Sequence, residues 1–150
     1  LLRSFIDTAS INEDLFKKSK DLTLKILESD TEEDIKKTVE QSFKKDFEVD
    51  KCMLEFYDNN ALDKIEETTG LSMHKGAIHC GSFSNEKMLF LFSDKKIESL
   101  VVAVIVIGEK IGLLKLGSYD RTKYLGDEDT TFIEYIRDIL EKKLTSSYEK

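Results

Sequence analysis

The chain has 150 residues, which is enough for one domain with a substantial hydrophobic core. Its composition is acidic, with 30 Asp and Glu against 23 Lys and Arg and a formal net charge of −7. Because a nucleic-acid-binding protein normally carries a basic stripe, and acids are interleaved with the positive charges here, we expect no direct binding to nucleic acid or to an anionic membrane.

The first 28 residues predict a helix, either continuous or in two pieces. Apolar residues recur along it at helical spacing, and Ser10 and Glu13 fit a capping box that indicates a start, or a restart, at Ile11. One interpretation is an amphipathic helix packed on its own domain. The other is a dimerisation helix, because so long a terminal helix exceeds what a small core needs. We therefore divide the chain into an N-terminal helical segment, 1–28, and a domain, 29–150.

A helix and a strand are predicted next. Asp30-Thr31-Glu32-Glu33 is a helix start signal, and the apolar spacing that follows it continues to about Lys45. Residues Phe47 to Tyr57 alternate in polarity and predict a strand. One face of this strand is apolar and carries Cys52, Leu54 and Phe56. The other is mixed and carries Val49, Lys51, Met53, Glu55 and Tyr57.

The middle of the chain is less regular. A turn at residues 58–60 precedes a short helix from Ala61 to Glu67, which Gly70 ends. Residues 71–83, which include His79 and Cys80, show no clear periodicity. Residues 84–92 fit either a helical turn or a strand, and the pattern leaves both open.

The longest apolar run, from Leu100 to Ile107, is rich in β-branched residues and predicts a strand that is buried on both faces. Gly108 to Lys110 interrupts the run before Ile111 to Leu116 resumes it, which is typical of a hairpin. A buried helix is the alternative, but β-branched crowding and the glycines argue against it. After a connector at 119–126, residues 127–144 predict a closing amphipathic helix. Helices and antiparallel strands in this order predict an α+β fold.

The hairpin and the closing helix resemble those of GAF domains, a PAS-like sensory fold. The resemblance rests on an apolar run, a turn with Gly, the sequence Ile111-Gly112-Leu113-Leu114-Lys115-Leu116 and the amphipathic helix after it. The chain is also similar to a bacterial family catalogued as domain of unknown function 484, a GAF-like domain behind an N-terminal helix. The most specific part of this similarity is the run from Gly112 to Asp120, Gly-Leu-Leu-x-Leu-Gly-Ser-x-Asp. Further shared features are Asn12-Glu13 with Leu15, Cys80-Gly81, Leu89-Phe90 or Leu91-Phe92, Ser99, Tyr124 and Thr130-x-Phe132.

This resemblance implies a GAF/PAS-like antiparallel sheet of about five or six strands. Terminal helices would cover one of its faces, and loops with short helices would cover the other, where small molecules bind. Such domains are usually non-catalytic and usually dimerise through their terminal helices. The expected role is therefore a sensory or regulatory domain, and neither the sequence nor the resemblance identifies the ligand or a cofactor.

Strand parity places a candidate ligand site on the second face of the sheet. The fully apolar strand faces should pack against the terminal helices, and the faces of mixed polarity should point toward the pocket. In the GAF-like strand order, Glu55 and Lys115 lie on neighbouring strands and should pair, because an unpaired, partly buried charge is costly. The pair is either a structural cross-strand salt bridge or the polar anchor of a small-molecule site. The predicted floor consists of Met53, Glu55, Tyr57, Leu113 and Lys115, and His79 and Cys80 are expected in or near the covering loop.

The histidines and cysteines predict no metal site. His79 and Cys80 would point apart in an extended chain, and neither His74 nor Cys52 completes a zinc spacing. A thiol-dependent enzyme that uses Cys80 is an alternative function, since a neighbouring His can lower the pKa of a thiol. The lack of a CxxC pair, of a disulfide framework and of a signal peptide indicates a reducing cytoplasm. No apolar run approaches the roughly 20 residues of a membrane span.

The predicted partner is a second copy of the chain. An apolar stripe lies ahead of the capping box, at Leu2, Phe5, Ile6 and Ala9. Burying a large apolar side chain is worth roughly 1.5–3 kcal/mol, which favours a partner for this stripe. We expect a two-fold homodimer in which these helices meet, joined by the closing helix around Phe132, Tyr135 and Ile139. A dimerisation or protein-interaction module without a ligand is the alternative function.

Overall fold

A two-stranded hairpin forms the centre of the structure, as the sequence predicts. The computed structural model describes residues 2–47, 49–121 and 130–149, and the side chains of 13–47, 49–121 and 132–146. In it, β3 (Ser99–Ile107) pairs with β4 (Lys110–Ser118). Gly108 and Glu109 form the turn, and Gly108 has a φ of 59°. A positive φ at the first of two turn positions is the geometry that glycine supplies in hairpins.

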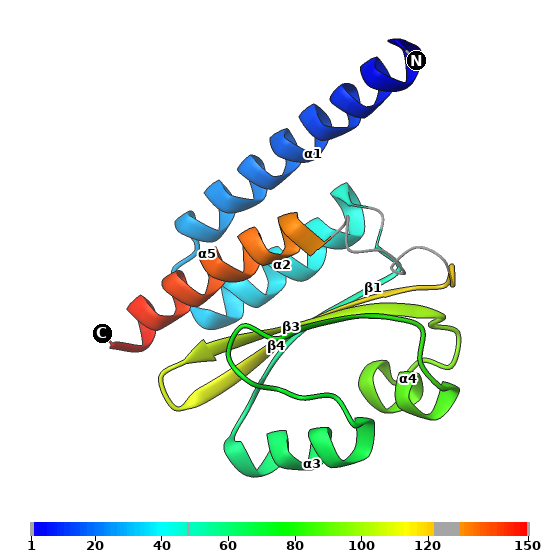
Figure 1. The fold of residues 1–150 in the computed structure, drawn as a ribbon. Helices are drawn as coiled ribbons and strands as arrows, with labels where there is room; N and C mark the ends of the chain where they lie inside the picture. Colours follow the sequence, from blue (N-terminus) through cyan, green and yellow to red (C-terminus); the bar gives the residue numbers. More distant parts are fainter. Residues whose placement is uncertain (1, 48, 122–129, 150) are drawn as a thin grey trace.

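Two further strands flank this hairpin. β1 (Lys51–Tyr57) and β2 (Ile78–Gly81) complete an antiparallel sheet with the order β1-β4-β3-β2 (Figure 1). The described residues thus form four strands, where the GAF resemblance implied about five or six. The predicted strand start at Phe47 is wrong, because helix α2 (Glu32–Asp46) continues up to this residue. The ring of Phe47 stacks instead on that of Phe132, with 5.1 Å between centroids.

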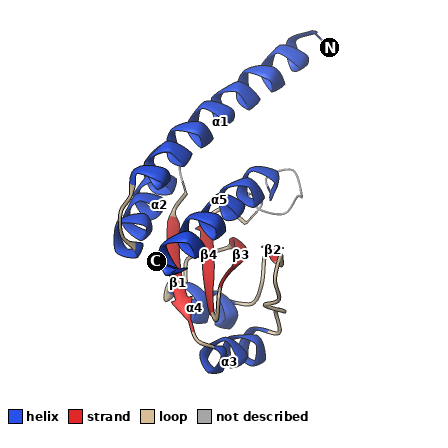
Figure 2. Ribbon diagram, turned by 90° about the vertical axis from the view of Figure 1, so that its left-hand side faces the viewer, coloured by secondary structure: helices blue, strands red, loops and turns tan. Residues whose placement is uncertain are grey.

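Helices α2 and α5 (Thr130–Glu149) lie on one face of the sheet, and α1 (Leu2–Glu28) packs on these two helices (Figure 2). Their buried side chains share one core with Cys52, Leu54, Leu114 and Leu116, which confirms that the apolar strand faces point toward the helices. Thr31 caps α2 by accepting from the N–H of Asp34, as expected from the start signal. The predicted restart at Ile11 is wrong, since α1 is continuous. An uninterrupted helix bonds its own backbone at Ser10 and needs no cap there.

Two short helices cover the opposite face of the sheet. Gly70 ends α3 (Asn59–Thr69) in the left-handed region with a φ of 72°, as predicted. Ser84 caps α4 (Asn85–Phe92) by accepting from the N–H of Lys87, so residues 84–92 form a helix and not a strand. A second core joins these helices to the sheet through residues such as Val102 and Leu113. The α+β class is therefore confirmed, while the finer GAF-like assignment stays a prediction.

Helix glutamates cap backbone groups at both open edges of the sheet. On the edge strand β1, the N–H of Leu54 donates to Glu40 Oε2 of α2 at 3.0 Å. On β3, beyond the end of the short β2, the N–H of Val106 donates to Glu141 Oε2 of α5 at 3.2 Å. Each carboxylate gives a strand N–H the partner that a further strand would otherwise supply.

Part of the predicted dimer surface falls outside the described residues. The side chains of Leu2, Phe5, Ile6 and Ala9 are outside them, as are the end of the connector and the predicted helix start at Asp127. On α5, Phe132 and Ile139 are partly buried against the core of their own chain, and Tyr135 is half exposed. No helix in the part of the chain that the structure describes is both long and apolar enough to cross a membrane.

Candidate functional site

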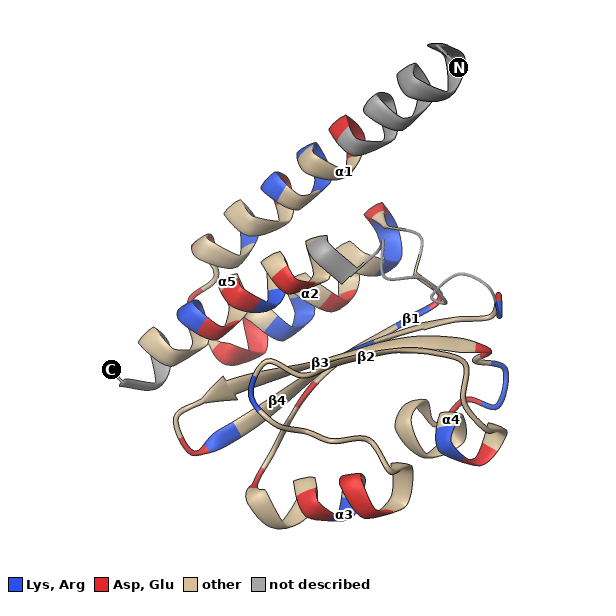
Figure 3. Cartoon of the chain, in the orientation of Figure 1, with Lys and Arg blue, Asp and Glu red and all other residues tan. Residues whose placement is uncertain are grey.

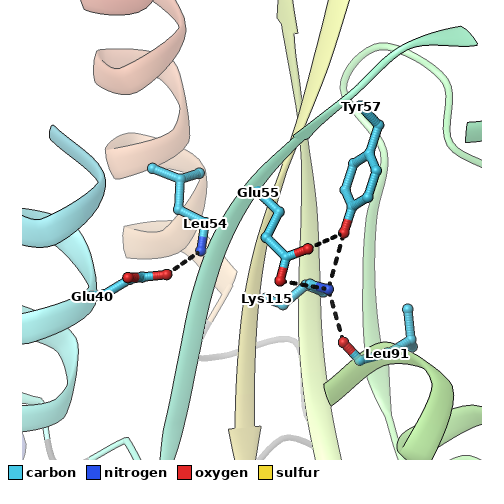
Figure 4. Close-up of polar contacts among 6 residues, drawn as sticks. All are labelled: Glu40, Leu54, Glu55, Tyr57, Leu91 and Lys115. Carbon is cyan, nitrogen blue, oxygen red and sulfur yellow. Dashed lines mark hydrogen bonds and ion pairs between the residues drawn. The ribbon is translucent and has the colours of Figure 1, made fainter. Parts of the chain in front are cut away.

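A buried polar cluster joins β1, β4 and α4 on the sheet face that α3 and α4 cover (Figure 4). The register sets Lys115 opposite Met53 and Glu55 opposite Leu113, so Glu55 and Lys115 meet diagonally across the two strands. Their closest approach, from Lys115 Nζ to Glu55 Oε1, is 3.7 Å. The predicted ion pair is therefore confirmed, and so is the face on which it lies.

Lys115 is enclosed and fully partnered within the chain. Only 3 % of the residue is exposed. Its Nζ donates to the carbonyl oxygen of Leu91 at 2.8 Å and to the hydroxyl oxygen of Tyr57 at 3.3 Å. The Tyr57 hydroxyl donates in turn to Glu55 Oε2 at 2.6 Å. Because Leu91 lies in the last turn of α4, the ammonium also sits at the negative end of that helix.

The protonation states in this cluster follow from burial. Desolvation lowers the pKa of Lys115, Glu55 opposes that change, and the charge of Lys36 adds slightly to it. For Tyr57, burial and the hydrogen bond to Glu55 both raise the pKa, so the phenol stays protonated as a donor. Tyr57 is thus a neutral phenol in this cluster, and the buried charge of Lys115 is tolerated mainly because of Glu55.

The rest of the predicted floor is covered by α4. Leu113 is completely buried and Met53 partly buried, both in the core that contains Met88 and Phe92 of α4. The packing is close: a Cβ added at Gly117 would lie 2.8 Å from Ile97 Cδ1. Of the five predicted floor residues, Glu55 and Tyr57 line a cleft beside β1, and Met53, Leu113 and Lys115 do not line it.

This cleft lies at the outer edge of β1 and carries charges of both signs. It has a volume of about 520 Å³ and is lined by Glu32, Lys36, Glu55, Phe56, Tyr57, Asp58 and Lys110. Lys110 Nζ is 3.9 Å from Glu32 Oε2, a loose pair in which both side chains are close to half exposed. The cleft could therefore offer ammonium and carboxylate groups to a small polar molecule.

The structure places His79 and Cys80 on β2 and not in a covering loop. His79 pairs with Val102 and so shares the face of the Lys115 cluster, and its Nε2 donates to the carbonyl oxygen of Ser72. Cys80 pairs with Val101 and packs against the core on the helical face. The two side chains thus lie on opposite faces, and the structure does not bring them together at one site.

The other candidate groups lie apart. Cys52 is buried in the helical core, where desolvation and the nearby Glu40 carboxylate raise the pKa of its thiol. His74 is exposed, with Nδ1 in contact with the carbonyl oxygen of Lys75. Among the residues that the structure describes, no group of three or more His, Cys, Asp and Glu side chains could hold a metal ion.

Comparison with protein families confirms the narrower of the two sequence resemblances. The profile described as "Protein of unknown function, DUF484" matches residues 1–149. The chain belongs to the DUF484 family. A comparison with curated proteins gave no match. DUF484 membership assigns no activity, so the function of this chain must be argued from its own residues.

Sequence reasoning missed five residues that line the cleft of this DUF484 chain. Two of them, Phe56 and Asp58, flank the predicted Tyr57, and the other three are Glu32, Lys36 and Lys110. Glu32 and Lys36 lie four residues apart on α2, a spacing that is typical of opposite charges on any exposed helix surface. Only the register of β1 and β4, which sets Tyr57 opposite Ile111, brings Lys110 beside the predicted floor. No pattern in the DUF484 sequence predicts that Glu32, Lys36 and Lys110 lie beside β1, because their proximity depends on the tertiary structure.

Proposed function

We propose that this chain is a non-catalytic regulatory domain that works as a homodimer joined through α1. The observation that carries the proposal is an apolar stripe on α1. It consists of Phe16, Leu24 and Leu27, which are 71 %, 49 % and 54 % exposed. Exposed apolar residues are normal when they are scattered, but three on one line of a helix are typical of a contact surface.

The stripe is separate from the face with which α1 packs on its own chain. Ser19, Leu22 and Ile26 are buried against the domain and already fix α1 there. Phe16, Leu24 and Leu27 lie on one helical line beside that face, since successive residues are about 100° apart around an α-helix. Burying large apolar side chains is worth roughly 1.5–3 kcal/mol each, which is enough to favour association through this line.

A charge-insertion experiment tests the dimer. We expect the intact chain to sediment as a dimer at tens of micromolar, and the Phe16→Glu/Leu27→Glu variant as a monomer. Gln41→Glu/Thr68→Glu adds the same charge at exposed positions of α2 and α3 and should remain dimeric. A monomeric wild-type chain, or a double variant that dimerises as well as the control, would show the proposal to be wrong.

A second function, the sensing of a small molecule, is supported by the cleft at the edge of β1. Its lining joins Lys36 and Lys110 to the carboxylates of Glu55 and Asp58, which suits a small polar molecule with charges of both signs. Glu55 also contacts Lys115, which holds the last turn of α4 through Leu91. A ligand that competes for the Glu55 carboxylate would therefore change the contact between sheet and helix.

Thermal-shift screening with zwitterionic metabolites tests this second function. A ligand should stabilise the wild type and lose its effect in Lys36→Ala and Lys110→Ala. The matched control is Lys37→Ala, since Lys37 is exposed on α2 and does not line the cleft. If no compound stabilises the wild type, or if all three variants respond alike, the cleft is only a surface feature.

The non-catalytic part of the proposal is supported by the positions of the thiols. Cys52 is buried, and Cys80 packs against the helical core. A thiol-dependent enzyme would need a reactive thiolate at Cys80, which would appear as rapid alkylation near neutral pH. We expect alkylation of the native chain to be slower than that of an ordinary exposed cysteine. Faster alkylation, lost in Cys80→Ser, would favour the enzyme instead.

A further inference from the structure

We propose that the two α1 helices pair antiparallel, with Phe16 next to the two-fold axis. This inference rests on the proposed dimer and adds the direction and register of its interface. The occupant of the stripe is a second copy of the chain, argued from the charges within the stripe itself. Figure 3 shows that the described part of α1 carries charges of both signs along its length.

Two charged residues interrupt the apolar stripe. Lys20 lies on the stripe between Phe16 and Leu24, and Glu13 lies almost one turn before Phe16 on the same side. Both side chains are exposed, and neither forms an ion pair with another described residue. They cannot pair with each other, because seven residues of helix separate them by about 10 Å along the axis.

The direction of the partner helix decides what these charges meet. A parallel pair in register sets Glu13 against Glu13 of the second copy and Lys20 against its Lys20. Like charges in contact are unfavourable. An antiparallel pair centred between residues 16 and 17 sets each Glu13 against the Lys20 of the second copy, because the two positions are equally far from that centre. The same centre brings the two Phe16 side chains together.

The apolar part of the stripe fits the same register. Position 24 would face position 9 of the second copy, and position 27 would face position 6. The sequence has Ala9 and Ile6 there, although their side chains lie outside the described residues. The sequence thus has apolar residues at the positions that Leu24 and Leu27 would face in this register.

The placement of the domain leaves room for this arrangement. Figures 1 and 2 show α1 running past the ends of α2 and α5, so only part of the helix lies against its own domain. The buried residues Leu22 and Ile26 lie in its C-terminal half. In an antiparallel pair the two domains lie at opposite ends, and the N-terminal half of each α1 runs along the stripe of the other.

Charge reversal is the first test, with dimer dissociation constants measured by sedimentation equilibrium. Glu13→Lys and Lys20→Glu should each weaken the dimer roughly threefold to thirtyfold, since each creates two like-charged contacts in an antiparallel pair. The double variant should return to within about twofold of the wild type, because its charges are complementary again. Glu67→Lys and Lys37→Glu are matched controls on α3 and α2 and should change little.

Disulfide trapping is the second test, because it shows directly which positions of the two α1 helices lie close together. Glu13→Cys and Lys20→Cys chains, one of them carrying a size tag, should cross-link when mixed and oxidised, and neither should cross-link alone. Wild-type chain under the same conditions controls for Cys52 and Cys80.

The outcomes separate the two proposals. Cross-linking of each variant with itself, or dimers that the single reversals leave unchanged, would overturn the antiparallel arrangement and leave the dimer standing. A monomeric wild-type chain would overturn both.

Discussion

Glu55 and Lys115 are unequal partners, and their removal should have unequal effects on stability. Glu55 has 30 % of its side chain exposed and Lys115 has 4 %. Glu55→Gln leaves the ammonium buried without its counter-charge. Breaking a buried pair costs about 3–5 kcal/mol, but Gln keeps an acceptor and Glu55 is partly screened by solvent, so we expect a loss of about 1–3 kcal/mol.

Lys115→Met should cost less, about 0–1 kcal/mol. It leaves the Leu91 carbonyl without its side-chain donor, an effect of about 1 kcal/mol. Against that, it removes the desolvation of a buried charge and puts an apolar chain of similar length in its place. Glu55 keeps the hydrogen bond from Tyr57 and its contact with water.

The double variant provides the sharpest comparison. With no charge left in the cluster, Glu55→Gln/Lys115→Met should be more stable than Glu55→Gln alone, so that a second substitution rescues the first. The chain has no tryptophan, so urea unfolding is best followed by far-UV circular dichroism. All variants should be measured at one protein concentration, because dimerisation would otherwise shift their apparent stability.

Additive losses in the double variant would refute this reasoning. They would show that the two side chains contribute independently and that burial of the ammonium without Glu55 carries no special cost. A greater loss for Lys115→Met than for Glu55→Gln would refute it as well, by showing that the hydrogen bonds from Nζ outweigh the cost of its charge.

Two further outcomes follow from the packing and protonation of this sheet face. Gly117→Ala should lower the free energy of unfolding by about 1–3 kcal/mol in the same urea assay. Its Cβ would lie 2.8 Å from Ile97 Cδ1 and 3.1 Å from Phe92 Cε1, both side chains are buried, and overpacking strains a core. The pKa of Lys115 is lowered from 10.5 in the folded chain, so the unfolded chain binds more protons between the lowered pKa and about pH 10.5. Over that range the free energy of unfolding should rise more steeply with pH in the wild type than in Lys115→Met. Equal slopes would show that folding does not lower the pKa of Lys115.

The elements that the sequence predicted best are those with a strong local signal. The β3–β4 hairpin follows from one long β-branched run, a glycine turn and a second run, and nothing in the tertiary structure competes with it. The Glu55–Lys115 pair could be predicted from two sources. Side-chain direction alternates strictly along a strand, which places both residues on the faces of mixed polarity, and the GAF-like strand order makes their strands neighbours.

The errors arose where contacts distant in sequence decide the structure. Phe47 matches the alternation of a strand, yet its ring packs on Phe132, 85 positions later in the chain, and thereby belongs to the helical layer. β2 has only four residues and forms because β3 offers it an edge, so residues 78–81 carry no pattern of their own. The cleft likewise depends on Lys110 reaching β1 through the register of another strand.

The glutamates that cap the sheet edges have a consequence for how copies of this chain can meet in a crowded solution. An uncovered strand edge is a template on which other chains can add strands without limit, which is the route to fibrils. Glu40 and Glu141 occupy the N–H groups of Leu54 and Val106, and each places a helix and a negative charge where an incoming strand would dock. Growth by strand addition is thereby disfavoured. The chain therefore exposes apolar side chains on α1, while a helix glutamate blocks a strand N–H at each side of its sheet.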